Sequence, residues 1–268
     1  MIKMTPSLFW SVLRQMVAMV SVFLCFSLPQ LPVHAAELPP IRIAAAANLN
    51  GVLIELTNLF SEQTKQSVDI VYGSSGNFYQ QIVQGAQFDV FLSANEEFAD
   101  RMAKQSLTQG QGVVYARGRL VLWVSPKSKV TLDQDVSDLR RALQDGRIDK
   151  FAIANPALAP YGLAASESLK RYGLIDLVQS HVVMGSDVGQ TMLFLKTQAA
   201  QAGMVPLSMV LPPHQLVNGP YILIPESFHT PILQKMVLMK NATQSAQKFY
   251  QFLQTNEARK IWRKYGYE

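Results

Sequence analysis

The feature of this 268-residue sequence that most limits its fold is a regular alternation of strand-like and helix-like segments. Strand-like segments at 41–46, 68–72 and 88–92 each precede a segment with apolar residues at three- and four-residue spacing. Short apolar or alternating runs bounded by turns are typical of strands, and the longer spacing is typical of helices. This order favours an α/β fold with a mainly parallel sheet.

The alternation continues through the middle of the chain and predicts a second α/β unit. Strands are expected at 119–124, 151–154, 181–184, 203–205 and 221–224, and helices at 137–143, 163–172 and 188–201. Thr230-Pro231 then marks a break, after which a strand at 232–239 and two amphipathic helices close the chain. We therefore expect two units, each a mainly parallel sheet flanked by helices.

The N-terminus has the pattern of an export signal. Lys3 and Arg14 are its only charges, residues 16–28 are apolar, and the small residues Ala35 and Ala36 follow. This pattern predicts that residues 1–36 form a signal peptide, cleaved after Ala35 or Ala36, and that the mature protein is periplasmic. An uncleaved anchor is the alternative, but the apolar run is shorter than the roughly 20 residues that a membrane span needs.

Cysteine content and charge exclude several classes of function. Cys25 is the only cysteine, and it lies in the predicted signal peptide in a poor lipoprotein context. We expect no lipid anchor, disulfide or thiolate chemistry in the mature chain. Without Lys3 and Arg14 the chain has 22 basic and 19 acidic residues, a net charge of +3. No basic run is present, so a nucleic-acid partner is not expected.

Four turns join predicted strands or loops to predicted helices: Ala47-Asn48, Ser74-Ser75, Pro160-Tyr161 and Asp187-Val188. A helix start carries free backbone N–H groups and the positive end of the helix dipole. Ligands of open α/β sheets bind at the carboxyl ends of strands, where these turns lie. If two lobes face each other, N–H groups at Ser75 and Val188, with the Asn48 and Tyr161 side chains, would surround a small dianion.

Simpler roles remain open for the same residues. Ser74 or Ser75 can act only as a helix cap, and Asp187 is expected to be one. Neutral donors at fixed positions would favour an oxyanion without a proton, because a ligand hydroxyl would meet donors and no acceptor. Cavity size would then separate oxyanions of different radius.

Several segments, in their order and spacing, resemble the periplasmic molybdate-binding proteins of ABC transporters. These segments are 44–49, 73–76, 88–94, 155–156, 186–188 and 262–267. The resemblance implies a two-lobed periplasmic binding protein of the Venus-flytrap type (type II-like), hinged to close on molybdate or tungstate. It further implies that residues 37–117 and 230–268 form one lobe and 118–229 the other. Two crossings, near Ala116-Arg117 and Thr230-Pro231, would form the hinge.

The resemblance also implies which residues bind the ligand: Ala47, Asn48, Ser75, Tyr161 and Val188. Many family members have a small residue in place of Tyr161 and a tyrosine near the position of Pro206. We infer that the Tyr161 hydroxyl replaces the missing one from the other side. The oxyanion would be held by hydrogen bonds, with no direct protein–metal bond and no cofactor. The implied partners are a membrane permease and its ATPase, and we expect a monomer.

A second hypothesis keeps the scaffold and changes the anion to sulfate or phosphate. Phosphate receptors usually supply an acceptor for the ligand's own proton, and Asp187 is the one nearby carboxylate in the sequence.

An enzyme is not expected. His181, His214 and His229 lie in separate segments without metal-ligand spacing. Ser245 and Lys248 match a Ser-x-x-Lys pattern but lack its companion motifs, and Ser75 has no identifiable base. A periplasmic signalling domain is a further alternative, but no output segment is recognisable in the sequence.

Overall fold

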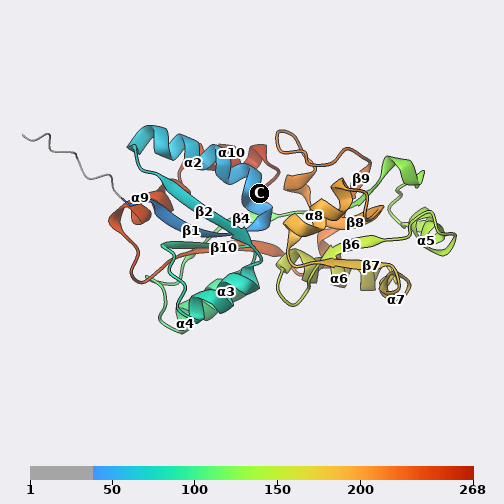
Figure 1. The fold of residues 1–268 in the computed structure, drawn as a ribbon, viewed down its shortest axis with the longest axis horizontal. Coiled ribbons are helices and arrows are strands. Elements are labelled where there is room, and N and C mark those ends of the chain that lie inside the picture. The colour runs from blue at the N-terminus through green and yellow to red at the C-terminus, as the bar shows by residue number, and fades with distance from the viewer. Residues whose placement is uncertain (1–38) are drawn as a thin grey trace, which may run out of the picture. The chain divides into compact units, whose positions relative to one another are not determined.

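The structure is a computed structural model that describes residues 39–268, so the predicted signal peptide lies outside the described residues. Two five-stranded sheets, each flanked by helices, make up this part of the chain (Figure 1). We call the sheet of β1–β4 and β10, with its helices, the first lobe, and the sheet of β5–β9, with its helices, the second lobe. The prediction of a two-lobed α/β fold is therefore confirmed.

The strand order is β2-β1-β3-β10-β4 in the first sheet and β7-β6-β8-β5-β9 in the second. The strands are β1 (Ile41–Ala46), β2 (Val68–Gly73), β3 (Val90–Ser93), β4 (Val113–Gly118), β5 (Leu120–Val124), β6 (Phe151–Ala154), β7 (Val182–Gly185), β8 (Ala202–Pro206), β9 (Tyr221–Leu223) and β10 (Ile232–Leu238).

Helices cover both faces of each sheet. In the first lobe α2 and α10 lie together on one face and α3 and α4 on the other; in the second lobe α8 lies opposite α6 and α7 (Figure 1). The helices are α2 (Asn50–Thr64), α3 (Ser75–Val83), α4 (Glu96–Lys104), α5 (Ser137–Gln144), α6 (Pro160–Arg171), α7 (Ile175–Gln179), α8 (Val188–Lys196), α9 (Gln244–Phe252) and α10 (Asn256–Lys264), with short 3₁₀ turns η1 (Ala47–Leu49), η2 (Pro126–Ser128), η3 (Leu207–Met209) and η4 (Glu226–Phe228).

The prediction of mainly parallel sheets is confirmed, because four of the five strands in each sheet run in the same direction and one, β10 or β5, runs the opposite way. In the first sheet β1 pairs in parallel with β2 and β3, whereas β10 is antiparallel to β3 and β4. In the second sheet β6 is parallel to β7 and β8, whereas β5 is antiparallel to β8 and β9. The chain leaves the first lobe along β4 and returns along β10, so these two strands lie side by side in opposite directions.

Three details differ from the sequence-based expectation. Strand β4 and the short helix α7 were not predicted, and α8 ends at Lys196 instead of continuing to Gln201. The early end follows from the backbone, because Gln198 has a φ of 61°, in the left-handed region that an α-helix cannot use.

The parallel half of each sheet aligns the turns that were predicted to bind a ligand. Ala46, the last residue of β1, pairs with Gly73, the last residue of β2. Ala154 at the end of β6 pairs with Gly185 at the end of β7. The helix-starting turns that follow therefore leave each sheet at one edge, as the carboxyl ends of parallel strands do.

Apolar side chains hold these layers in place. On one face of the first sheet, Phe78 and Ile82 of α3 pack with Phe91 of β3 in a buried cluster. In the second lobe β5 is buried along its whole length, including Trp123 at 1% exposure. Among the described helices, none is both long enough and apolar enough to span a bilayer.

Candidate functional site

A small cavity lies where the four helix-starting turns meet. Its lining includes Ala47, Asn48 and Ser75 from the first lobe and Tyr161 and Val188 from the second. The structure thus brings together all five residues predicted to bind a ligand. The volume is about 10 Å³, close to the minimum needed to hold one water molecule, so a ligand here has few atoms.

Hydrogen bonds join the two lobes beside this cavity. The Gly76 N–H donates to the Leu158 carbonyl at 2.8 Å, and the Ser208 hydroxyl donates to the Asn48 carbonyl at 3.2 Å. Gly76 is also required sterically, because a Cβ there would lie 2.9 Å from the Leu158 backbone. The lobes are therefore in direct contact around the cavity.

The starts of α3 and α8 are capped so that their first N–H groups stay free. Ser74 Oγ accepts the N–H of Asn77 at 3.4 Å, and Asp187 Oδ1 accepts the N–H of Gln190 at 3.0 Å. Ser74 and Asp187 are thus helix caps, as expected for Asp187. The N–H groups of the first helical residues, Ser75 and Val188, have no acceptor within their own helices. Both residues line the cavity, at the positive end of each helix dipole.

The Ser75 hydroxyl is oriented by a backbone group. Its Oγ accepts the Ala94 N–H at 2.9 Å, and the residue is 1% exposed. A serine hydroxyl has one proton to donate and lone pairs that accept. Because Ala94 engages one lone pair, and no protein acceptor lies within hydrogen-bonding distance of the proton in residues 39–268, the proton is available to a ligand in the cavity.

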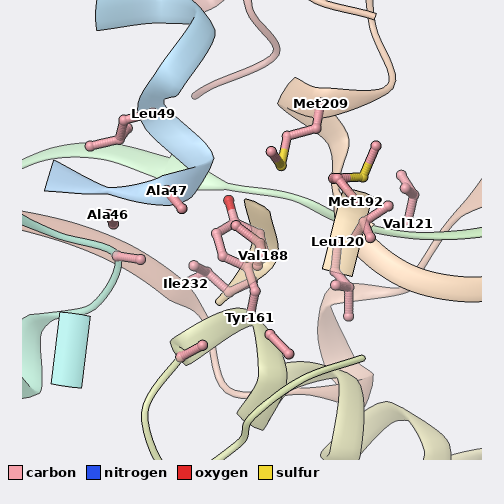
Figure 2. Close-up of a cluster of buried hydrophobic side chains, with 14 of the residues drawn as sticks. Ala46, Ala47, Leu49, Leu120, Val121, Tyr161, Val188, Met192, Met209 and Ile232 are labelled. Carbon is pink, nitrogen blue, oxygen red and sulfur yellow. The ribbon is translucent and has the colours of Figure 1, made fainter. Parts of the chain in front are cut away.

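Tyr161 has the same arrangement in the second lobe. It rises from α6 with its hydroxyl toward Ala47 (Figure 2), and this hydroxyl accepts a hydrogen bond from Gln234 Nε2 at 3.2 Å. Burial raises the pKa of Tyr161 well above its ordinary value of 10, so the phenol keeps its proton. A Cβ at Gly118 would collide with the hydroxyl, so the glycine makes room for it.

The Asn48 side-chain amide is hydrogen-bonded within the protein. Its Nδ2 donates to Gln234 Oε1 at 2.9 Å and to the Tyr267 hydroxyl at 3.0 Å. Both side-chain amide hydrogens are therefore paired within the protein, while the amide oxygen Oδ1 is buried and has no hydrogen-bond partner among the described residues. The backbone N–H of Asn48, in the η1 turn at the cavity, is the donor that the residue can still offer.

Sequence reasoning missed the residues behind the cavity. Gln234 is fully buried and contacts Asn48, Tyr115 and Tyr161, while Tyr267 contacts Asn48 and Ser208. One signal was available for Gln234. In the alternating pattern of 232–238 it falls on the same face as Ile232, Met236 and Leu238, which are buried, and a polar residue at such a position needs a hydrogen-bonding partner.

The cavity lining contains no lysine or arginine, and Asp187 is its one charged residue. In the described part of the chain, no group of three or more His, Cys, Asp or Glu side chains is arranged to hold a metal ion. The lining residues offer hydroxyl protons and backbone N–H groups at helix starts, together with two acceptors, the Asp187 carboxylate and the buried Asn48 Oδ1, which has no hydrogen-bond partner in the described part of the chain. Such a set of donors suits an oxyanion better than a cation.

Comparisons with known proteins agree with this arrangement. Residues 41–268 match the family described as bacterial extracellular solute-binding protein. The molybdate-binding protein ModA of Rhodobacter capsulatus is 35% identical, over 88% of this chain and 90% of its own length. The solved periplasmic molybdate-binding protein of Azotobacter vinelandii is 32% identical, with a TM-score of 0.77 over 85% of this chain and 98% of that protein.

A more distant neighbour shares the fold alone. The sulfate-binding protein SubI of Mycobacterium tuberculosis is 15% identical, with a TM-score of 0.66 over 86% of each chain. The family match covers both lobes and every residue of the cavity. The chain therefore belongs to the bacterial extracellular solute-binding proteins, a family of binding proteins and not of enzymes.

Proposed function

We propose that this protein captures molybdate or tungstate between its lobes and delivers it to the permease and ATPase of an ABC transporter. The observation that carries the proposal is the hydrogen bonding of the Ser75 and Tyr161 hydroxyls in the cavity. Ser75 and Tyr161 each already accept a hydrogen bond from an N–H group, so each has a proton left for a ligand. A fully deprotonated tetrahedral oxyanion accepts on all of its oxygens and matches this set of donors.

The ligand would be held by Ala47, Asn48, Ser75, Tyr161 and Val188, all of which line the cavity. Backbone N–H groups and the two hydroxyls would contact the oxyanion's own oxygen atoms, with no direct protein–metal bond. Molybdate is then a transported ligand and not a cofactor. Two relatives named for molybdate binding, at 35% and 32% identity, support this choice of anion.

The proposal also covers the hinge motion of the two lobes and the location of the protein in the cell. Residues 37–117 with 230–268 would form one moving body and 118–229 the other, hinged near Ala116-Arg117 and Thr230-Pro231. Strands β4 and β10, which pair side by side at these crossings, support this division. We also propose that removal of residues 1–36 releases a monomer into the periplasm.

Thermal unfolding of the mature protein with molybdate, tungstate, sulfate, phosphate or chloride tests the function. A ligand at about 1,000 times its dissociation constant adds about 4 kcal/mol to the free energy of unfolding. We expect a large rise in Tm with molybdate and tungstate only. A rise with sulfate or phosphate instead would keep the site and change the ligand, and no rise with any oxyanion would contradict the proposal.

A further inference from the structure

Gln234 lies behind the cavity and connects the two lobes through one amide group. It is fully buried in β10, and its Nε2 reaches Tyr161 of the second lobe while its Oε1 reaches Asn48 and Tyr115 of the first. We propose that Gln234 is a positioning residue that contributes to anion specificity, because it makes the Tyr161 hydroxyl a donor to the ligand and so disfavours a protonated ligand oxygen at this contact. This inference rests on the proposed function.

The contacts of Gln234 fix which end of its amide faces Tyr161. Its Oε1 accepts Asn48 Nδ2 at 2.9 Å and the Tyr115 hydroxyl at 3.1 Å. An amide oxygen has two lone pairs, so these donors occupy it fully. The nitrogen must then point the other way, toward the Tyr161 oxygen at 3.2 Å.

Asn48 is itself held in one orientation. The Tyr267 hydroxyl donates its proton to the backbone carbonyl of Asn48 at 2.7 Å, so it accepts from the side-chain Nδ2 of Asn48 at 3.0 Å. Nitrogen is thus the end of the Asn48 amide that suits both Tyr267 and Gln234. Asn48 therefore donates to Gln234, and Gln234 donates to Tyr161. Asn48, Gln234 and Tyr267 are each at most 2% exposed. Little water is present to offer other partners.

This orientation of Gln234 determines which ligand atoms Tyr161 can bind. The Tyr161 hydroxyl accepts from Gln234, and within residues 39–268 no protein acceptor lies in hydrogen-bonding reach of its own proton, so this proton is available to a ligand in the cavity. A protonated oxygen placed at this contact, such as the hydroxyl of hydrogen phosphate, would bring a second donor to Tyr161 and leave one of the two donors unpaired. An unpaired buried donor costs affinity. Ser75, whose oxygen accepts from Ala94, also has its proton available to a ligand from the first lobe.

A double-mutant cycle tests whether Gln234 acts through Tyr161. Gln234→Met keeps the length of the side chain and removes its hydrogen bonds. We expect it to weaken molybdate binding about tenfold in the wild-type background, the effect of one lost hydrogen bond. In a Tyr161→Phe background, the same change should alter affinity less than about twofold, because the hydroxyl that Gln234 orients is absent.

Gln66→Met is the matched control. Gln66 is also a buried glutamine, 5% exposed, with Nε2 donating to the Pro39 carbonyl at 2.9 Å. It precedes β2, whereas the cavity residues follow the other end of that strand. We expect a lower Tm and unchanged molybdate affinity. A tenfold effect of Gln234→Met in both backgrounds, or no effect in either, would overturn the proposal while leaving the wild type a molybdate binder.

Gln234→Glu tests specificity. The new carboxylate would accept the Tyr161 proton, so the tyrosine oxygen would turn its lone pairs to the ligand. We expect the ratio of molybdate to phosphate affinity, measured by calorimetry, to fall at least tenfold. An equal loss for both anions would show that added negative charge alone is responsible and would contradict the proposal. Wild type that binds no oxyanion would contradict the proposed function itself.

Discussion

The cavity between the lobes and the open pocket beside α10 differ in nearly every property expected of an anion site. The α10 pocket is about 480 Å³ and includes Arg117, Arg259 and Arg263 in its lining. The cavity between the lobes is about 10 Å³ and contains no basic residue. If positive charge decided where the anion binds, it would bind in the α10 pocket. Fixed and buried hydrogen-bond donors instead favour binding in the cavity between the lobes. Charge attracts any anion, but donors at fixed positions in a dry site select one by shape and protonation.

The two pockets share a wall of buried polar side chains. Tyr115 and Tyr267 line the α10 pocket and also take part in the hydrogen bonds that reach Asn48 and Gln234. A change in this wall therefore affects the cavity without touching a ligand. The comparison predicts that substitutions in the cavity change affinity strongly and those on the arginines change it little.

The largest effect is expected from filling the cavity. Ser75→Leu removes the hydroxyl donor and puts an apolar side chain where the ligand's oxygen would sit. We expect molybdate affinity to fall by about 1,000-fold or more, since overpacking adds to the lost hydrogen bond. Calorimetry measures the loss, and circular dichroism checks that the variant folds. Affinity within about tenfold of wild type would remove Ser75 from the site.

High pH should destabilise the wall between the pockets. Burial raises the pKa of Tyr161 and of Tyr267 above the ordinary value of 10. Above pH 10 the unfolded chain loses these protons while the folded chain keeps them, so stability is complete below pH 10 and falls as pH rises. Each such tyrosine lowers the free energy of unfolding by up to about 1.4 kcal/mol per pH unit.

Denaturant titrations between pH 9 and 11 measure this slope. Tyr161→Phe is the matched variant, and it should give a shallower decline than wild type because one buried phenol is absent. An identical slope in both proteins would mean that Tyr161 ionises as freely in the folded chain as in the unfolded one.

An intermediate effect is expected from deleting one backbone donor. Val188→Pro removes the N–H at the first residue of α8, a position where proline suits a helix. The preceding residue, Asp187, is extended and compatible with a following proline. A hydrogen bond to a charged group contributes about 1.5–3 kcal/mol, so we expect affinity to fall about 10- to 100-fold. Val188→Ala keeps the N–H and should bind like wild type; equal binding by both variants would exclude this donor.

The smallest effect is expected in the α10 pocket. Arg259→Ala combined with Arg263→Ala removes two exposed charges that have no ion pair within the described residues. We expect molybdate affinity to stay within about twofold at physiological salt, where distant exposed charges are screened. A loss larger than that from Val188→Pro would reverse the comparison and place the anion among the arginines.

The positions of the cavity residues were predictable because each lies in a local pattern of strand, turn and helix. Ser75 and Val188 follow capping residues that the sequence already identifies, and their strands align at one sheet edge by simple pairing rules. The direction of each donor was not predictable. The Asn48 amide nitrogen pairs with residues that are 186 and 219 positions away in the sequence, and local spacing contains no information about such contacts.

The reversed direction of one strand in each mainly parallel sheet was not predictable for a similar reason. Strand β10 is as apolar as a parallel strand, and its direction depends on the return of the chain to the first lobe, not on its own residues. Gln234 in this strand is the one residue whose sequence context points to a buried polar contact. It is also the residue that links the cavity hydroxyl to the rest of the polar wall.

The hydroxyls of Ser75 and Tyr161 each keep a proton to donate, so we expect the cavity to prefer an oxyanion without a proton. Calorimetric titration of the mature protein with molybdate and with phosphate, at one pH and salt concentration, tests this directly. We predict saturable binding of one molybdate per chain, and no saturable heat from phosphate at about 1,000 times the molybdate dissociation constant. Phosphate binding within about tenfold of molybdate would contradict the claim.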